Sequence, residues 1–235
     1  MMTFTSIASS SKGNAYLVEA PGAHPMLLEA GLPIRELREK LAFGLSGISA
    51  CLISHEHGDH SKAVKDLLKS GVDCWMSQGT ADALGVGEHH RTYCFVDETE
   101  TLFPDGWRIR TFKLNHDAAE PLGFLIAQGD DRLLFIPDTE YVEPRFVGVT
   151  IAAVECNHIE DILSANIQRG AIAGVIGRRV RRNHMSLQTV IDMLRANDLS
   201  RCRAIYLLHL SDANSDERRM KLEVQQATGI PTIIC

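Results

Sequence analysis

The feature that most constrains this chain is a buried strand that ends in a cluster of histidines. Residues 48–54 form a continuous apolar run, the pattern of a strand covered on both faces. The next six residues contain three histidines and two acidic residues, whereas the whole chain of 235 residues has 10 histidines. Imidazole and carboxylate groups are the usual zinc ligands, and carboxylates also suit manganese. The cluster therefore predicts a metal site at the carboxyl end of a strand.

The spacing of the first two histidines predicts that the cluster lies on a loop. His55 and His57 are two residues apart, which places them on opposite sides of a strand and about 200° apart on a helix. Neither element would allow both rings to bind one ion. Gly58 gives the chain the conformational freedom to turn back. With Asp59 and His60, such a loop could supply ligands to two neighbouring ions.

The composition is that of a globular protein with an acidic balance. Hydrophobic residues make up 45% and charged residues 23%, which is enough for a sizeable core, and we expect one domain spanning residues 1–235. The 24 basic and 30 acidic residues give a net charge of −6, which argues against non-specific coating of nucleic acid. The six cysteines form no C-x-x-C pair, and no apolar run approaches the ~18 residues of a membrane span. We expect a cytoplasmic protein with reduced thiols and no membrane association.

Apolar periodicity predicts strands and helices interspersed along the whole chain. The expected strands cover residues 4–8, 15–19, 26–28, 48–54, 72–76, 93–96, 107–114, 123–127, 132–136, 149–155, 204–208 and 231–234. The expected helices cover residues 33–43, 61–70, 78–84, 186–196 and 216–228, with Ser186 as a cap. This pattern favours an α/β (α+β) architecture with a two-sheet core and helices outside.

Further ligand-type residues stand just past other predicted strands. His116, Asp138, His158 and His209 each follow an apolar strand, and Glu29 follows residues 26–28. Sites in sheet proteins commonly lie at such strand ends. A lone strand-end histidine is ordinary, but in a chain that already holds the cluster, His116 and His209 are predicted to be ligands.

The order H-x-H-x-D-H, then a lone His, a lone Asp and a final His, resembles the metallo-β-lactamase superfamily. The resemblance covers the whole chain and implies an αββα sandwich of two mixed β-sheets flanked by helices, with two divalent metal ions. The ligand chemistry leaves zinc and manganese open. Carried over by position, the resemblance implies a first metal ion bound by His55, His57 and His116, a second bound by Asp59, His60 and His209, and Asp138 as a ligand to both. Glu29 stands where the family usually has Asp, at a position that orients the loop.

Shorter motifs resemble the WalJ (YycJ) branch of this superfamily, which is associated with 5′-to-3′ exonuclease activity on DNA. They lie at residues 6–14, 28–31, 155–158, 183–186 and 207–211. The chain differs in being shorter after residue 158 and in having four arginines within residues 178–182. Asp138 stands where the main zinc β-lactamases carry Cys, and His57 where flavodiiron enzymes carry Glu. These differences argue against antibiotic hydrolysis and against redox chemistry at iron.

The resemblance and the chemistry of the residues together suggest catalytic and substrate-binding roles. Asp59, His158 and His184 are predicted to be catalytic, with His184 protonating the leaving oxygen because imidazole titrates near neutral pH. The residues predicted to hold substrate phosphates are Ser10, Lys12, Asn14, Asn157, Arg179 and Arg181. The alternative interpretation of residues 178–182 is a solvated charged loop that does not contact substrate.

Three functions stay open at the level of sequence. We prefer a metal-dependent nuclease acting on DNA ends, because the WalJ-like motifs and the arginine run favour it. A phosphodiesterase for a small or cyclic nucleotide is the alternative, favoured by the acidic net charge. A metal-binding protein of the same fold without catalysis is the third, although every ligand position is filled. The oligomeric state is also open, with a homodimer among the alternatives.

Overall fold

The computed structural model describes residues 1–41, 44–96 and 99–235, which form two compact units. The first unit comprises Met1–Lys113 and Ala118–Asp131, and the second comprises Leu114–Asp117 and Arg132–Cys235. This division does not test the prediction of one domain over residues 1–235, which stays a prediction. Within the described residues, every helix is too short or too polar to cross a membrane.

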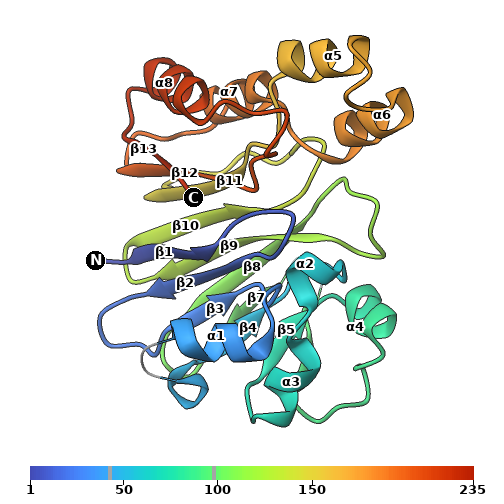
Figure 1. Cartoon of the computed structure of the whole chain (residues 1–235). Helices are drawn as coiled ribbons and strands as arrows, with labels where there is room; N and C mark the ends of the chain where they lie inside the picture. The colour runs from blue at the N-terminus through green and yellow to red at the C-terminus, as the bar shows by residue number, and fades with distance from the viewer. Residues whose placement is uncertain (42–43, 97–98) are drawn as a thin grey trace. The chain divides into compact units, whose positions relative to one another are not determined.

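The first unit is built on a six-stranded mixed sheet (Figure 1). Its strands, in spatial order, are β1 (Thr3–Ala8), β2 (Ala15–Glu19), β3 (Met26–Leu28), β4 (Cys51–Leu52), β5 (Cys74–Met76) and β6 (Thr92–Cys94). The pairs β1–β2 and β2–β3 are antiparallel, and the pairs from β3 to β6 are parallel. The helices of this part are α1 (Ile34–Lys40), the short 3₁₀ helix η1 (Leu45–Gly47), α2 (Gly58–Ser61), α3 (Val64–Lys69) and α4 (Gln78–Leu84).

Apolar side chains of these helices pack on the sheet in one core. Leu37 of α1 and Leu67 of α3 are completely buried together with Leu27 and Ile53 of the sheet region. The first unit also holds three antiparallel strands, β7 (Glu100–Leu102), β8 (Arg108–Lys113) and β9 (Leu122–Gln128). Burial of so much apolar surface fixes the ends of β3 and β4, from which the polar residues of the first unit project.

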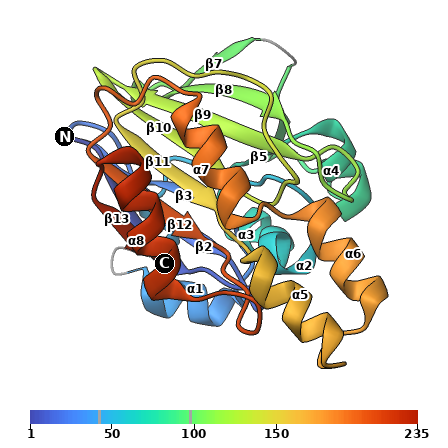
Figure 2. The same ribbon diagram turned by 90° about the horizontal axis from the view of Figure 1, so that it is seen from above.

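The second unit contains four parallel strands in the order β13-β12-β11-β10. They are β10 (Asp131–Ile136), β11 (Ile151–Glu155), β12 (Ala204–Leu208) and β13 (Thr232–Ile234). The helices are α5 (Glu160–Gln168), α6 (Gly174–Asn183), α7 (Leu187–Arg195) and α8 (Glu217–Thr228). Figure 2 shows α7 and α8 lying along the strands β11 to β13. Every residue of β11 is buried, as expected of a central parallel strand.

Most predicted elements are confirmed to within a few residues. The helix predicted at residues 78–84 has those bounds, and Ser186 caps α7 by accepting a hydrogen bond from the Thr189 backbone N–H at 3.2 Å. The helix predicted at residues 61–70 was wrong in its start, because α2 begins at Gly58 and α3 follows separately. The last two residues of the helix predicted at 33–43 lie outside the described residues.

The largest error concerns the segment after β11. Residues 178–182 are part of the helix α6 and not of a loop, and α5 was not predicted. Elsewhere in the chain, the short strand β7 was not predicted either. Two glycines and four arginines in α6 hide the apolar period that marks a surface helix. Gly177 packs closely against α5, because a Cβ there would lie 2.3 Å from Cδ1 of Ile167 and that side chain would have to move.

Candidate metal centre

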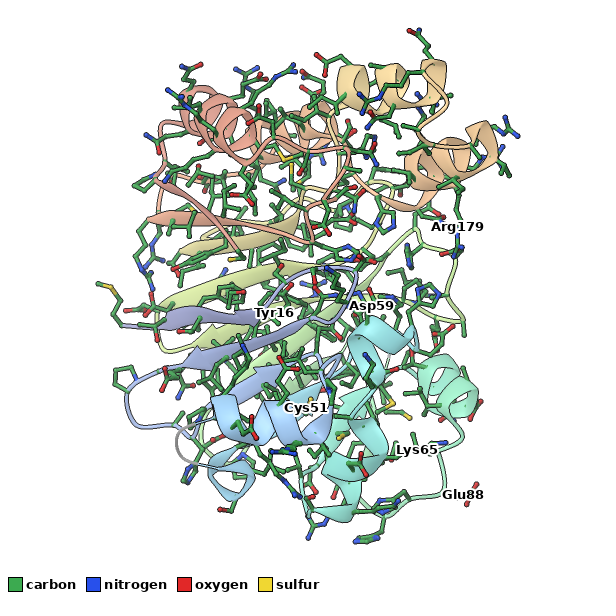
Figure 3. All side chains as sticks on the ribbon, viewed as in Figure 1. Tyr16, Cys51, Asp59, Lys65, Glu88 and Arg179 are labelled. Carbon is green, nitrogen blue, oxygen red and sulfur yellow. The ribbon has the colours of Figure 1, made fainter. Side chains whose placement is uncertain are left out.

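The histidine loop, residues 54–60, leaves the carboxyl end of β4. The backbone N–H of Ile53 still donates to the carbonyl of Trp75 at 2.9 Å, whereas that of Ser54 donates to Oε2 of Glu29 at 3.3 Å. His57 precedes the first turn of α2, so Asp59 and His60 are helical and not part of a loop as predicted. Asp59, labelled in Figure 3, lies in α2, where the strand has given way to a helix.

Backbone contacts hold the histidine loop against two neighbouring segments. The N–H of Asn14 donates to the carbonyl of Asp59 at 2.7 Å, and the N–H of Ala30 donates to the carbonyl of His60 at 2.7 Å. Gly31 passes so close to the loop that a Cβ would lie 1.7 Å from the Asp59 carbonyl oxygen. Only glycine fits at residue 31, because any side chain would overlap this backbone.

The imidazoles of the loop lie close together, and a hydroxyl orients one of them. The ring centroids of His55 and His57 are 4.7 Å apart, and those of His55 and His60 are 4.1 Å apart. Ser54 Oγ lies 2.8 Å from Nδ1 of His55. This hydrogen bond leaves Nε2 as the ring nitrogen suited to a metal, since ligating imidazoles normally bond through their other nitrogen.

Two buried residues contact His60 from opposite sides. Oε1 of Glu29 lies 3.6 Å from Nδ1 of His60, and the Asn14 amide nitrogen lies 3.2 Å from Nε2. Both Glu29 and Asn14 are completely buried. Glu29 also adopts a φ of 63°, a left-handed backbone that non-glycine residues rarely take. The longer acid thus reaches both His60 and the Ser54 backbone.

The second unit gathers four potential ligands in the carboxylate–imidazole cluster, which consists of Asp138, Glu155, His184 and His209. One ligand atom of each lies within 4.8 Å of the others. Nδ1 of His209 is 3.0 Å from Oδ1 of Asp138 and 3.5 Å from Oε1 of Glu155. His184 hydrogen-bonds Glu155 through Nδ1, which lies 3.8 Å from Oδ2 of Asp138. Three members come from the carboxyl ends of the adjacent strands β10, β11 and β12.

His116 lies beside this cluster. Its Nε2 is 3.9 Å from Oδ2 of Asp138, and its ring centroid is 5.4 Å from that of His184. Nδ1 lies 2.9 Å from the carbonyl oxygen of Asn183, and because a carbonyl only accepts, this nitrogen carries the proton. Nε2 is then the nitrogen available to a metal, and it faces Asp138.

Burial and charge set the protonation of the cluster. Burial opposes the charge on His184, but the Glu155 carboxylate, aided by Asp138, outweighs it and raises the pKa of His184. Burial likewise opposes the charge on Glu155, and the contact with His184 lowers the pKa of this carboxyl below its ordinary value. The pKa of His116 is lowered by burial, which favours the neutral, metal-binding ring.

The donor set fits a divalent cation. Asp138 is 3% exposed and Glu155 is completely buried, so two carboxylates lie out of water among three imidazoles. Buried carboxylates are stable when they are paired or coordinate a metal. Nitrogen and oxygen donors of this kind suit both zinc and manganese.

Glu155 was missed as a candidate from the sequence alone. Its Oε2 accepts hydrogen bonds from the backbone N–H groups of Thr139 at 3.1 Å and Met185 at 3.0 Å, while Oε1 contacts His184 and His209. A signal was present, because Glu155 is the acidic last residue of a buried strand, and Asp138 stands two residues past the end of β10.

Two asparagines that were predicted to bind substrate are buried and support the backbone of the site. The Asn14 amide donates to the carbonyl of Asp59 at 3.2 Å, and its Oδ1 accepts from the Tyr16 hydroxyl at 3.0 Å. The Asn157 amide donates to the carbonyl of His209 at 3.0 Å. His209 needs this support because its φ is 53°, and among the described residues only Glu29 shares that left-handed backbone without being glycine.

The remaining predicted residues fall outside these clusters. His158 is 2% exposed, and its Nε2 lies 3.8 Å from Glu160 Oε2. Ser10 and Lys12 form the turn between β1 and β2, where the Lys12 N–H donates to Ser10 Oγ at 3.2 Å. The two arginines predicted to bind substrate form ion pairs, Arg179 with Asp117 and Arg181 with Glu160.

Comparison with known proteins identifies the family. A family model described as "Beta-lactamase superfamily domain" matches residues 24–210, which include the histidine loop, His116, Asp138 and His209. The chain belongs to the metallo-β-lactamase superfamily. It is a hydrolase of this superfamily, and its two mixed β-sheets with flanking helices are the fold that the sequence predicted.

Curated relatives confirm the resemblance to the WalJ (YycJ) branch. Exodeoxyribonuclease WalJ of Streptococcus pneumoniae is 28% identical over 228 residues, covering 90% of this chain and 82% of the relative. Exodeoxyribonuclease YycJ of Bacillus anthracis is 26% identical over 238 residues, covering 95% and 88%.

Solved structures agree with the family assignment at the level of fold. The metallo-β-lactamase fold protein YhfI of Bacillus subtilis has a TM-score of 0.76 at 15% identity and covers 100% of this chain and 97% of its own. Zn²⁺-bound PqqB of Methylobacterium extorquens has a TM-score of 0.75 at 16% identity, with the same coverage.

Proposed function

We propose that this protein is a 5′-to-3′ DNA exonuclease that cleaves phosphodiester bonds with two divalent metal ions. The observation that carries the proposal is the hydrogen-bonded pair of His184 and Glu155 beside the potential ligands Asp138 and His209. This arrangement combines metal donors with a group that can hold a proton, and both can assist the cleavage of a phosphodiester. The curated relatives of similar length, both named exodeoxyribonucleases, support the choice of DNA.

We assign the metal ligands by the order of the family motif. The first ion would be held by His55, His57 and His116, the second by Asp59, His60 and His209, and Asp138 would bind both. The donor chemistry within each unit supports this assignment and suits zinc or manganese. Two such ions, when bound, lower the pKa of a water and stabilise the attacking and leaving oxygens of an in-line displacement.

His184 is suited to protonate the leaving oxygen. Its Nδ1 is engaged by Glu155, so when the ring is charged the Nε2–H is the proton that it can donate. Glu155 stabilises that charge and fixes the orientation of the ring. Glu155 is itself held by two backbone N–H groups, so the His184 ring is positioned before substrate binds.

Replacement of Glu155 by glutamine is expected to lower kcat for DNA cleavage by ~10–100-fold, with little change in KM. The amide keeps the shape of the carboxylate but does not stabilise a charged His184. Steady-state rates on labelled single-stranded DNA would measure the effect. Glu217→Gln is the matched control, because Glu217 is an exposed acid of α8 in the same unit. An unchanged kcat in Glu155→Gln would remove Glu155 from the mechanism.

The function itself is tested with two classes of substrate. The purified protein would be incubated with Mn²⁺ or Zn²⁺ and either end-labelled single-stranded DNA or a panel of cyclic nucleotides. We expect early release of a 5′ label and progressive shortening of 3′-labelled DNA, both stopped by a chelator. Turnover of a cyclic nucleotide with intact DNA would favour the small-nucleotide phosphodiesterase instead. The absence of metal-dependent turnover on either class would favour a non-catalytic metal-binding protein.

A further inference from the structure

One face of α6 lines a positively charged pocket. Val175, Arg178, Arg179 and Arg182 follow the spacing i, i+3, i+4 and i+7, which aligns side chains on one side of a helix. All four are exposed. Together with Asp117 and Asn183 they line a pocket of about 330 Å³, here called the α6 pocket.

Arg181 lies outside this pocket and has a structural contact. Its Nε donates to both carboxylate oxygens of Glu160, at 3.0 and 3.1 Å, and Nη2 donates to Ser164 Oγ at 2.9 Å. Glu160 and Ser164 belong to α5, against which α6 packs through Gly177. The four arginines of residues 178–182 therefore fall into two groups. Arg181 holds α6 against α5, and the other three arginines line the α6 pocket.

The pocket carries positive charge that the protein does not neutralise. Arg178 and Arg182 have no ion-pair or hydrogen-bond partner among the residues that the structure describes. Arg179, labelled in Figure 3, shares the carboxylate of Asp117, with Nη2 at 3.0 Å and Nε at 3.1 Å. Three guanidinium groups thus face one carboxylate in a chain whose net charge is −6. A local concentration of this kind attracts an anion, and guanidinium binds phosphate in a bidentate manner.

The pocket adjoins His116 and His184 of the candidate metal centre. Asp117 follows His116 directly, and Asn183 precedes His184. The Asn183 carbonyl accepts the hydrogen bond from His116 Nδ1 at 2.9 Å, which joins the pocket wall to the cluster. A ligand in the pocket would therefore lie next to a substrate bound at these histidines, and Val175 gives the pocket an apolar wall.

We propose that the α6 pocket binds the phosphodiester backbone of a DNA strand outside the scissile bond, mainly through Arg178 and Arg182. The inference rests on the proposed exonuclease function and narrows its substrate to a polymer, because a single nucleotide has no neighbouring phosphate to offer. It also replaces Arg181 with Arg178 and Arg182 in the set of residues that contact substrate.

The test is the salt dependence of DNA binding by the variant R178A/R182A. Fluorescence anisotropy would follow binding of a single-stranded oligonucleotide with cleavage-resistant phosphorothioate linkages to the metal-loaded protein over a series of salt concentrations. Each phosphate contact to a single strand contributes ~0.7 to the slope of log K against log salt, so the slope is expected to fall by about 1.4. R178K/R182K, which keeps both charges, is expected to restore most of the slope.

The matched control is R218A/K221A on α8, which removes the same charge from two exposed positions of the same unit. It is expected to keep the wild-type slope. Equal slopes for wild type and R178A/R182A, or an equal loss in the control, would overturn the α6 pocket. DNA cleavage by the wild type is scored separately. If the wild type cleaves DNA and R178A/R182A leaves the slope unchanged, only the α6 pocket is rejected. If R178A/R182A lowers the slope but the wild type does not cleave DNA, the exonuclease function is rejected and the pocket remains a DNA-binding site.

Discussion

Replacement of Asp138 by alanine is expected to abolish metal-dependent DNA cleavage. The carboxylate lies 3.0 Å from His209, 3.8 Å from His184 and 3.9 Å from His116, and we assign it to both metal ions. Loss of a residue that only supports a ligand lowers metal affinity or activity by ~10–100-fold, so loss of the shared ligand should exceed about 100-fold. Initial rates and the metal content of the purified protein, measured by mass spectrometry, would both fall.

Two further variants test whether the loss of cleavage is specific to the proposed metal ligands. Asp130→Ala removes an exposed carboxylate near the start of β10 and should keep both activity and bound metal. His57→Ala should also abolish cleavage, because it removes one of the proposed ligands of the first ion. Rates like those of the wild type in Asp138→Ala or His57→Ala would reject the two-metal assignment.

Replacement of Gly31 by alanine is expected to destabilise the first unit by about 3 kcal/mol or more, at the upper end for an added group in a packed interior. The new Cβ would lie 1.7 Å from the carbonyl oxygen of Asp59 and 2.6 Å from the backbone nitrogen of Asn14. Both neighbours are backbone, so relief requires movement of the histidine loop itself. Denaturant unfolding would report the stability loss, and metal content would report displacement of the loop.

Gly58→Ala is the control within the same loop. A Cβ at Gly58 meets no atom within 4 Å, so this variant should unfold at close to the wild-type denaturant concentration. If Gly31→Ala also unfolded there, the close approach of residue 31 to the loop would not limit stability.

The sequence was most informative where chemistry and strand pattern coincide. The histidine loop, His116, Asp138 and His209 were predicted to be ligands because ligand-type residues follow apolar strands. Burial is a property of the folded chain and was therefore harder to predict from the sequence. Asn14 and Asn157 were expected to contact substrate, yet both are buried and hold the carbonyls of Asp59 and His209.

The arginine run shows a second limit. A solvated loop has no fixed faces, so residues 178–182 could not be divided into structural and substrate-facing members. In the helix α6, Arg181 points to Glu160 of α5, whereas Arg178 and Arg182 line the α6 pocket. Glu155 was overlooked for a related reason, because a single acid at a strand end gains meaning only when His184 is found beside it.

The left-handed backbone at Glu29 and His209 has a consequence for how this protein can be stabilised by mutation. That conformation costs an ordinary side chain roughly 1–2 kcal/mol and is natural for glycine and tolerated by asparagine. A selection for thermostability alone would therefore enrich Gly or Asn at both positions. Each replacement would remove a carboxylate or an imidazole from the candidate metal centre, so we expect stability and the proposed catalysis to be opposed at these two positions.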